Sequence, residues 1–179
     1  MELVFKSIII FTIFQRIGEL FISKRNERKI ILGGGIIVPE KNYILMVFLH
    51  VSWLGLLTYF AFFTLLDLSP IFFYTFFGFF IVGQILRITA ILTLGKRWST
   101  RILILPNSSV VKKGIFNYIK HPNYLGVVLE IAALPLMANL WLVSLIFSFA
   151  NAIILFFRIR EEERNLKVHT NYAEKFSGV

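Results

Sequence analysis

The stretch YIKHPNYLGVVLE, residues 118–130, joins a polar, basic segment to an apolar one through a single proline. Proline is favoured in the first turn of a helix, where its missing N–H group costs no hydrogen bond. We therefore predict that a helix begins at Pro122, with His121 at or near its cap. The free backbone N–H groups of such a helix end form a ready site for a carboxylate or a phosphate. The plainer alternative is that Pro122 only starts a helix and His121 is a polar residue at the membrane interface.

The sequence around this stretch is typical of a membrane protein. Of its 179 residues, 57% are hydrophobic and 20 are phenylalanine, and the mean hydropathy is +0.75. A helix of about 20 apolar residues crosses the roughly 30 Å hydrocarbon layer of a bilayer. Apolar windows of suitable length lie at residues 3–22, 43–66, 71–94, 122–138 and 141–157. They predict an all-α, polytopic membrane protein with about five transmembrane helices. A single domain, residues 1–179, would carry its motifs in residues 95–167.

The positive charge follows the apolar windows. The net charge is +9, and the basic residues cluster after the first, third and fifth windows, whereas residues 67–70 and 138–140 contain no lysine or arginine. By the positive-inside rule, the N-terminus is predicted outside and the C-terminus in the cytoplasm. The same rule accounts for the charge without a nucleic-acid partner. Alternatively, the last two windows form a shallower hairpin, because the fourth is short and Pro135 would kink it.

Several classes of site are not expected from this sequence. The chain has no cysteine, and His50, His121 and His169 lack the spacing of metal ligands, so neither a disulfide nor a metal site is predicted. No G-x-G-x-x-G motif and no P-loop occurs, which argues against a Rossmann-type cofactor site. The first window has Glu2 where a signal peptide would be basic, and no small-residue cleavage site follows it, so we expect a retained helix.

Polar residues at membrane depth form the next signal. Glu130 lies about two turns into the predicted fourth helix, where an ionisable group is costly and is usually paired or functional. Arg87 lies within the third window, and Arg16 and Glu19 lie in the first. One interpretation is a set of interhelical salt bridges, for example between Arg87 and Glu130. The other is a functional site, and the two are compatible.

The segment FFRIREEERNL, residues 156–166, carries a second candidate group where the fifth helix leaves the membrane. Arg158 and Glu162 are four residues apart and therefore share one face of this helix. For most such pairs the correct interpretation is a solvated ion pair of little consequence. Here both His121 and Arg158 are expected at the cytoplasmic ends of neighbouring helices. Together they would frame a pocket with one side in lipid and the other in water, suited to joining a lipophilic acceptor to a water-soluble donor.

These motifs resemble a known family. SSVVKKGIFNYIKHPNYLGVVLE (residues 108–130) and RIREEERNL (residues 158–166) are similar to the signature of the isoprenylcysteine carboxyl methyltransferase family, G-x-[YF]-x-x-x-[RK]-H-P-x-Y followed by an arginine and a Glu-Glu pair. The first half, including QRIGELFISKRNERK (residues 15–29) and LGKRWSTRILILP (residues 94–106), resembles a bacterial branch associated with alkylpyrones and alkylresorcinols.

The resemblance implies S-adenosylmethionine as the cofactor, with no metal, in a cytoplasmic-side pocket formed by the last two helices and the preceding loop. The cofactor contacts that it implies are Ser108, Ser109, Val110, Val111 and Phe116 around the adenosyl group, and His121, Pro122, Asn123 and Tyr124 near the amino-acid moiety. Glu162 would hold the cofactor from the opposite side, although the role falls to any of residues 161–163. Arg158 would engage the acceptor oxygen, and Glu130 would be a second substrate-binding residue that orients the junction from behind. Lys120 stands where arginine is usual, which keeps the charge and loses bidentate geometry.

The implied function is O-methylation of a lipophilic acceptor at the membrane–cytoplasm interface, in a bacterial inner membrane. The acceptor would be an alkylpyrone-type hydroxyl or an isoprenylcysteine-type carboxylate, and the first half of the chain favours the hydroxyl. Transfer to an acidic oxygen requires mainly positioning. A less acidic phenol would need a base, for which His121 or a carboxylate is a candidate. The alternatives are a phospholipid N-methyltransferase, a nicotinamide-dependent membrane reductase and a non-enzymatic scaffold.

Overall fold

Helices make up most of the structure, a computed structural model that describes residues 1–40 and 42–176. The α-helices are α1 (Glu2–Leu32), α2 (Tyr43–Phe63), α3 (Pro70–Leu94), α4 (Pro122–Met137), α5 (Trp141–His169) and α6 (Tyr172–Phe176). The connections contain the 3-10 helices η1 (Gly95–Arg97) and η2 (Gly114–Asn117) and the strands β1 (Ile36–Ile37) and β2 (Leu103–Ile104). The predicted all-α class is confirmed.

The helix starts and stops follow local chemistry. His121 is the N-cap of α4 and Pro122 its first residue, as predicted. The first helix is longer than predicted, because α1 continues through KRNERK to Leu32 instead of ending near residue 22. Lysine, arginine and glutamate favour helices, so the charges end the apolar window without ending the helix. The chain leaves the helix through Gly33 and Gly34, whose φ of 82° is readily adopted only by glycine.

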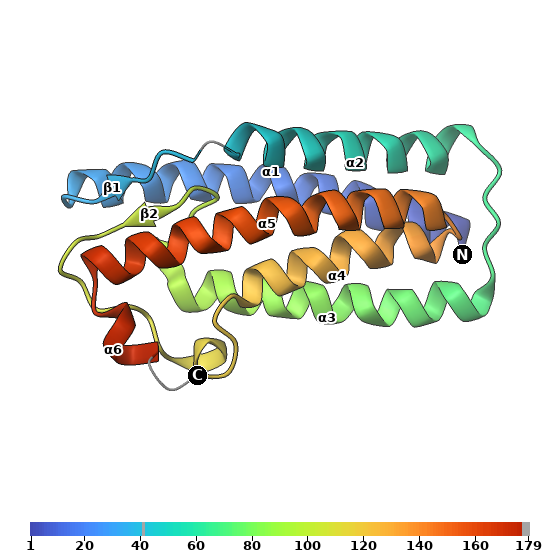
Figure 1. The fold of residues 1–179 in the computed structure, drawn as a ribbon. Helices are drawn as coiled ribbons and strands as arrows, with labels where there is room; N and C mark the ends of the chain where they lie inside the picture. The colour runs from blue at the N-terminus through green and yellow to red at the C-terminus, as the bar shows by residue number, and fades with distance from the viewer. Residues whose placement is uncertain (41, 177–179) are drawn as a thin grey trace.

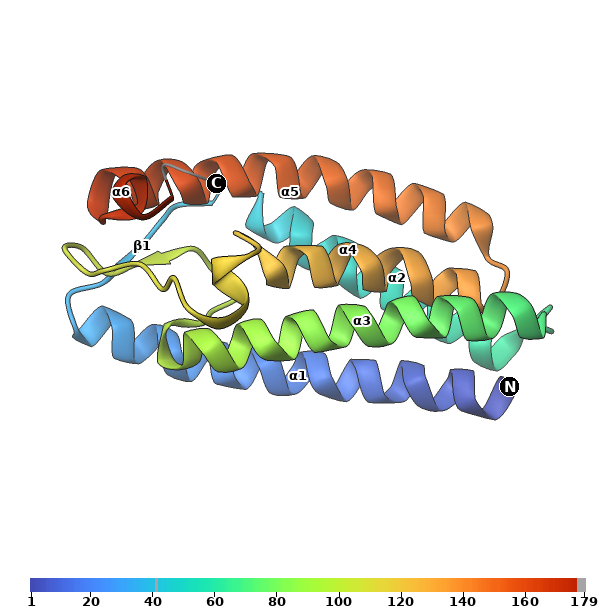
Figure 2. The ribbon, with the colours of Figure 1, turned by 90° about the horizontal axis from the view of Figure 1, so that it is seen from below.

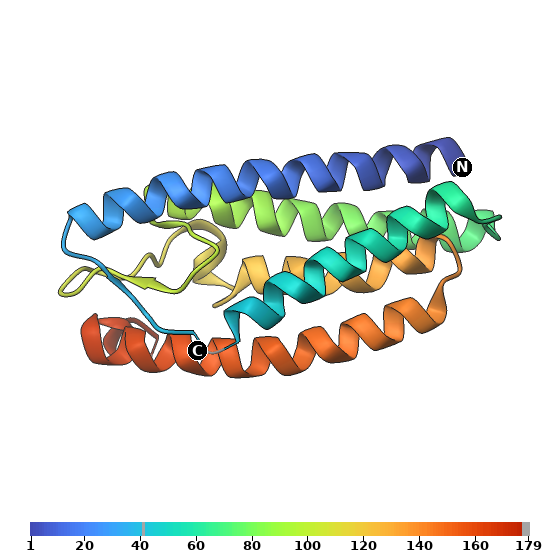
Figure 3. The same cartoon turned by 90° about the horizontal axis from the view of Figure 1, so that it is seen from above.

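The five long helices lie side by side in one elongated bundle (Figure 1). α3 packs along α4, α4 packs against α5, and α2 crosses the side of the bundle obliquely between α1 and α5 (Figure 3). The α2–α3 and α4–α5 connections lie at the end that holds the N-terminus, whereas β1, β2 and α6 lie at the opposite end (Figure 2). All the segments with basic clusters therefore meet at one end of the bundle.

The outer surface of the bundle suits a membrane. Three helical segments are long and apolar enough to cross one: Tyr43–Phe63, Pro70–Arg97 and Trp141–His169. α4 is a shorter apolar helix of 16 residues. Large apolar side chains project outward from these helices, among them Phe48, Phe63, Tyr74, Phe79 and Phe149. Helices that are apolar on all sides are typical of membrane spans. The protein is thus a helical membrane protein, while the number of crossings stays a prediction.

The apolar core occupies the half of the bundle nearest the N-terminus. Its fully buried members include Phe5 of α1, Trp53 and Leu57 of α2, Phe73 of α3 and Leu134 of α4. Farther along the bundle, buried polar and charged side chains appear, among them Glu19, Arg87 and Arg158. The end with β1, β2 and α6 contains a small second apolar cluster of Val38, Ile102 and Ile104 and the cavities described below. The sequence thus places its ionisable groups progressively toward the basic end.

Two glycines allow α3 and α4 to touch. A Cβ atom at Gly126 would lie 2.5 Å from Arg87 Cγ and 2.7 Å from the Gly83 carbonyl oxygen, and one at Gly83 would lie 2.9 Å from the Gly126 carbonyl oxygen. Small residues of this kind let the backbones of membrane helices approach closely. This close approach brings the middle of α4 within reach of the polar side chains of α3.

Replacing Gly126 by alanine is expected to destabilise the protein by about 1–3 kcal/mol, since overpacking of a close contact costs roughly that amount. The backbone carbonyl of Gly83 cannot move without shifting α3. Gly78→Ala, in the neighbouring helix α3, is the control, because a Cβ there meets nothing within 4 Å. Thermal unfolding in detergent should show a lower midpoint for Gly126→Ala only. An equal effect of both substitutions would mean that glycine flexibility, and not helix approach, is what matters.

The short β pairing ties together two distant connections. Ile36 pairs with Ile104 and Ile37 with Leu103, antiparallel, and the Val38 N–H donates to the Ile102 carbonyl at 3.0 Å. The sequence analysis did not predict this pairing, because two-residue strands leave no periodic pattern. It holds the α1–α2 connection against the loop between α3 and α4, and so brings residues near position 40 to the end of α5.

Candidate functional site

A cavity lies at the basic end of the bundle, between the start of α4, the end of α5 and the loop that precedes α4. We call it the His121 cavity. Every residue predicted to bind the cofactor lines it: Ser108, Ser109, Val110, Val111, Phe116, His121, Pro122, Asn123, Tyr124 and Glu162. Lys120, Leu166 and Tyr172 also contribute to its wall. The structure thus brings together residues spread over more than fifty sequence positions, although their binding role stays a prediction.

The loop that forms one wall of this cavity is anchored at several points. Asn26 of the unpredicted part of α1 donates to the carbonyl oxygens of Trp98, at 2.8 Å, and Gly95, at 3.1 Å. At the other end, Asn107 N–H donates to the His169 carbonyl at 2.9 Å, and Val110 N–H donates to Asn171 Oδ1 at 2.9 Å. The end of α1 therefore holds the loop in place, a role that its charged sequence did not reveal.

The start of α4 presents polar groups to the cavity. The His121 ring stacks on the Tyr124 ring with centroids 5.3 Å apart. The first backbone hydrogen bond of the helix runs from Leu125 N–H to the His121 carbonyl, at 3.1 Å. Asn123 Oδ1 is buried and has no hydrogen-bond partner in the protein. Because an unsatisfied buried oxygen is costly, Asn123 is a natural acceptor for a donor group of a bound molecule.

A chain of hydrogen bonds connects α4 to α5. Arg158 Nε donates to the Tyr124 hydroxyl at 2.9 Å, and this hydroxyl donates to Glu162 Oε2 at 2.5 Å. Arg158 and Glu162 thus do share one face, as predicted, and Tyr124 connects them. His121 and Arg158 both contact Tyr124, so the two helix tips converge. The sequence analysis expected this convergence, and it did not foresee that Tyr124 would be the link.

The two neighbouring carboxylates, of Glu161 and Glu163, have other hydrogen-bond partners. Glu163 Oε1 lies 3.1 Å from His121 Nε2 and accepts from the Tyr172 hydroxyl at 3.1 Å. Burial, together with the nearby Glu163 carboxylate, raises the pKa of Tyr172, which keeps its hydroxyl protonated as a donor. Glu161 accepts hydrogen bonds from Arg164 and Asn165 on the other side of α5. Of the three acidic residues, Glu162 is the one that lines the His121 cavity.

A second cavity lies on the far side of Arg158, and we call it the Glu40 cavity. Its wall comprises Val38, Pro39, Glu40, Asn42, Ile102, Ile154, Phe157, Arg158, Glu161, Arg164 and Asn165. Glu40, on the connection between α1 and α2, forms an ion pair with Arg158 and accepts a hydrogen bond from Ile102 N–H at 2.6 Å. Arg158 Nη2 also donates to the Thr100 carbonyl at 2.6 Å. Sequence reasoning missed Glu40, whose only signal is a single acid in a short connection.

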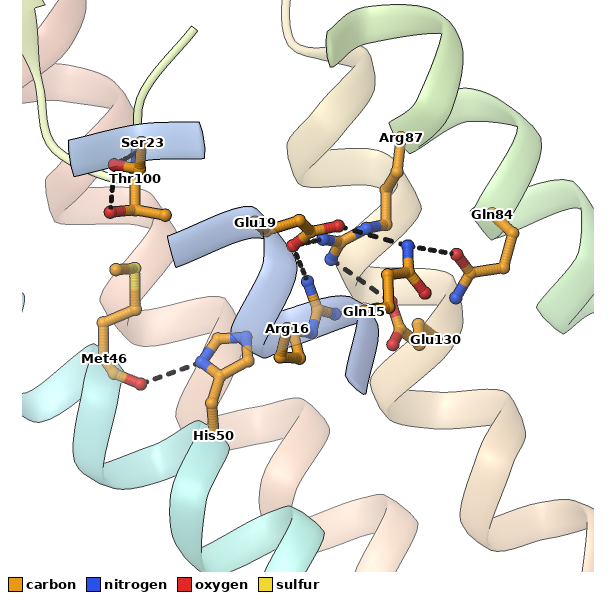
Figure 4. A network of polar contacts seen from close by, with 10 residues as sticks. All are labelled: Gln15, Arg16, Glu19, Ser23, Met46, His50, Gln84, Arg87, Thr100 and Glu130. Atoms are coloured by element: carbon orange, nitrogen blue, oxygen red, sulfur yellow. Dashed lines mark hydrogen bonds and ion pairs between the residues drawn. The ribbon is translucent and has the colours of Figure 1, made fainter. Parts of the chain in front are cut away.

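Glu130 lies deeper in the bundle, in a network of charges shown in Figure 4. Its Oε2 accepts from Arg16 Nη2 at 2.6 Å and from Arg87 Nη1 at 3.2 Å, which confirms the predicted Arg87–Glu130 pair. Glu19 completes the network as an ion-pair partner of both arginines. Gln15 donates to Gln84 beside it, at 2.8 Å. The structure therefore places Glu130 among interhelical salt bridges instead of in the wall of the His121 cavity.

Comparison with known proteins identifies the relatives of this chain. A family model described as "Isoprenylcysteine carboxyl methyltransferase (ICMT) family" matches residues 74–168. The chain is similar to Uncharacterized protein YpbQ of Bacillus subtilis (strain 168), with 34% identity over 159 residues, 88% of this chain and 94% of that protein. It is also similar to an uncharacterized protein of Haemophilus influenzae, with 28% identity over 153 residues, 83% of this chain and 86% of that protein. No solved structure gives a significant match.

The family match covers α4, nearly all of α5 and the loop between α3 and α4, which supply most of the wall of the His121 cavity and part of the wall of the Glu40 cavity. The more similar relative extends the likeness over most of both chains. On these two findings, the chain belongs to the isoprenylcysteine carboxyl methyltransferase family of membrane methyltransferases.

Proposed function

We propose that this protein is a membrane O-methyltransferase that uses S-adenosylmethionine and acts on a lipophilic acceptor at the cytoplasmic face of the membrane. The observation that supports it most strongly is the His121 cavity. All the residues matched to the family's cofactor site line it, although they come from separate segments of the chain. Tyr124, which lines this cavity, also accepts a hydrogen bond from Arg158 Nε at 2.9 Å.

The walls of the His121 cavity fit the proposed cofactor. Val110, Val111, Phe116 and Leu166 form an apolar surface of the kind that suits a flat purine ring. At the opposite side, Glu162 offers a carboxylate to a positively charged group, and Asn123 offers its unpartnered oxygen to a donor. An N-terminal helix end also favours a carboxylate. S-adenosylmethionine carries groups of each of these kinds, and its sulfonium supplies a methyl group that is already electrophilic.

The protein's own contribution is to hold and orient the two reactants. Glu162 would hold the cofactor, and Arg158 would hold the acceptor oxygen from the neighbouring cavity. Tyr124 keeps these side chains in a fixed relation, because its hydroxyl binds both of them. Holding reacting groups in line removes much of the entropic cost of a bimolecular reaction. In this proposal the acceptor's tail lies along the apolar part of α5 and its oxygen lies near Arg158.

The arrangement of the bundle supports five crossings with the N-terminus outside. The connections that contain basic clusters gather at the end with both cavities, and those without lysine or arginine lie at the other end. The end with both cavities would face the cytoplasm, where S-adenosylmethionine is made. The membrane would be a bacterial inner membrane. The chain would work as one domain, since the first helix anchors the cofactor loop through Asn26.

The direct test incubates the purified protein in detergent with methyl-labelled S-adenosylmethionine and a lipid extract, and identifies the labelled products. We expect label in a lipophilic product that depends on the protein. A methyl ester is labile to base, whereas a methyl ether or a methylamine is stable, so treatment with base and mass analysis assign the acceptor. Binding of NADPH without binding of S-adenosylmethionine would refute the proposal and favour the reductase.

Glu162→Gln is expected to weaken cofactor binding by about 10- to 100-fold, because a hydrogen bond to a charged group contributes roughly 1.5–3 kcal/mol. The substitution keeps the shape of the side chain and its capacity to accept from Tyr124, so folding should be preserved. Calorimetric titration of S-adenosylmethionine in detergent measures the effect. Glu161→Gln is the matched control, since the Glu161 carboxylate contacts Arg164 and Asn165 and does not line the His121 cavity. Equal affinity losses in both variants would contradict the assignment.

A further inference from the structure

The end of α1 carries a row of exposed cations, Lys24, Arg25, Arg28 and Lys29. At roughly 100° per residue, they fall within an arc of about 140° on one side of the helix. Within residues 1–40 and 42–176, no carboxylate forms an ion pair with any of them. We call these four side chains the basic row of α1. The protein itself leaves their positive charge uncompensated.

The one acid within this segment has partners on the inner side of the helix. Glu27 Oε1 accepts from Ser23 Oγ at 2.9 Å and from Ser99 Oγ, of the loop after α3, at 3.0 Å. Asn26 is 1% exposed and donates to carbonyl oxygens of the same loop. The end of α1 therefore has an inner side that binds the loop and an outer side on which all the charged groups are cations.

The basic row lies level with the point where α3 ends. The last residue of α3 is Leu94, and the carbonyl of the next residue, Gly95, accepts from Asn26 at 3.1 Å. Figure 2 shows α1 and α3 side by side over this length. α3 belongs to a segment that is long and apolar enough to cross a membrane, so the hydrocarbon layer around it would end near its last residues. The basic row therefore falls at the depth of the lipid head groups.

The spacing of the row favours an anion between its members. Lys24 and Arg28 are four residues apart, as are Arg25 and Lys29, and like charges at this spacing repel each other and destabilise a helix. A bound anion removes that repulsion. Phe21 lies on the same side of the helix, toward the membrane, and is 71% exposed, so it offers apolar surface to an acyl chain. A ligand that suits both features is a lipid with an anionic head group.

We propose that the basic row of α1 binds the head group of an anionic phospholipid of the adjacent leaflet, with Phe21 against its acyl chain. Lysine and arginine donate charge-assisted hydrogen bonds to phosphate oxygens, and basic clusters directly beyond a membrane helix attract anionic lipids. The inner side of the same helical turns holds Trp98 and Ser99, which line the His121 cavity. A lipid bound to the row therefore also stabilises that wall of the cavity.

The test titrates phosphatidylglycerol into the full-length protein in a neutral detergent and counts bound lipid by native mass spectrometry. A variant with glutamine at all four positions of the basic row is expected to bind about 10²–10³-fold more weakly than the wild type, and each single substitution about fivefold more weakly, the usual contribution of one basic residue near an anionic membrane. Phosphatidylglycerol should also raise the midpoint of thermal unfolding of the wild type and leave that of the fourfold variant unchanged. The single variants keep the test decisive if the fourfold variant does not fold.

The control removes the same amount of charge from other exposed positions at this end of the bundle, with glutamine in place of Lys113, Arg160, Arg164 and Lys167. Its affinity should fall by less than about fivefold, because charges outside the row act only through a field that salt screens. An equal loss in the control and in the fourfold variant would overturn the site, since net charge alone would then explain binding.

Two further ligands complete the test. Phosphatidylcholine of the same chain length should bind more weakly than phosphatidylglycerol, and glycerol phosphate should not compete at equal concentration. A wild-type protein that binds both lipids equally, or that binds glycerol phosphate as well as the lipid, would overturn the proposal of an anionic-lipid site. None of these measurements requires methyl transfer, so the methyltransferase proposal stands or falls separately.

Discussion

Replacing Arg158 by alanine is expected to slow methyl transfer by about 10²–10³-fold, the usual effect of removing one charge-stabilising donor from an active site. In the described residues, 1–40 and 42–176, the Arg158 guanidinium is the one group that contacts Tyr124, Thr100 and Glu40 together. Without it, the Glu40 carboxylate loses its partner and, under the proposed function, the acceptor oxygen loses its cation. Single-turnover transfer from labelled S-adenosylmethionine to a lipophilic acceptor measures the effect.

The matched variant for this prediction is Arg158→Lys. Lysine keeps the charge, but its single ammonium group cannot reproduce the planar set of three donors. We expect its rate to fall between those of the wild type and Arg158→Ala, with cofactor affinity close to wild type in both variants, since Glu162 and Asn123 remain. If Arg158→Ala lost cofactor binding and thermal stability to the same extent as activity, the role of Arg158 would be structural.

Replacing Glu130 by alanine is expected to destabilise the protein by about 3–5 kcal/mol, the cost of leaving a buried charge without its partner. Arg87 is 1% exposed and Glu130 is fully buried, so water cannot take the place of the lost carboxylate. Arg16 and Arg87 would then share Glu19 alone. Unfolding by SDS titration in detergent micelles measures the change in free energy.

Two comparisons make the Glu130 prediction specific. The double variant Arg87→Met, Glu130→Leu should lose less free energy of unfolding than the two single variants lose in sum. The reason is that it removes both buried charges together. Glu2→Ala, which breaks an exposed pair with Lys6, should leave the unfolding transition unchanged. A Glu130→Ala protein of normal stability that has lost acceptor binding would instead support the substrate role that the sequence suggested.

The sequence was informative where chemistry is local. The proline of His-Pro-Asn-Tyr sets the start of α4, and the four-residue spacing of Arg158 and Glu162 sets their common helix face. The apolar windows predict the helices because a membrane span needs a long uninterrupted apolar run. The Arg87–Glu130 pair was also predicted, since two opposite charges at membrane depth have few other groups to pair with.

Other parts of the site depend on how distant segments meet. The helix-favouring residues at positions 24–29 are compatible with a longer α1, but they do not show that Asn26 meets the loop between α3 and α4. The pattern also does not show that two-residue strands bring Glu40 to Arg158, although these residues are more than a hundred positions apart. A helical period tells which residues share a face, but not the rotation or depth at which that face meets its neighbour.

The sequence by itself determined that this is a helical membrane protein with a polar helix junction at Pro122 and an Arg158–Glu162 face, because proline geometry, helical period and the cost of charge in lipid act within short segments. Only the tertiary structure decided that Tyr124 joins that face to the junction, that Glu162 and not its neighbours lines the cavity, and that Glu40 faces Arg158. These contacts depend on packing between elements, where a small rotation of one helix exchanges one side chain for another.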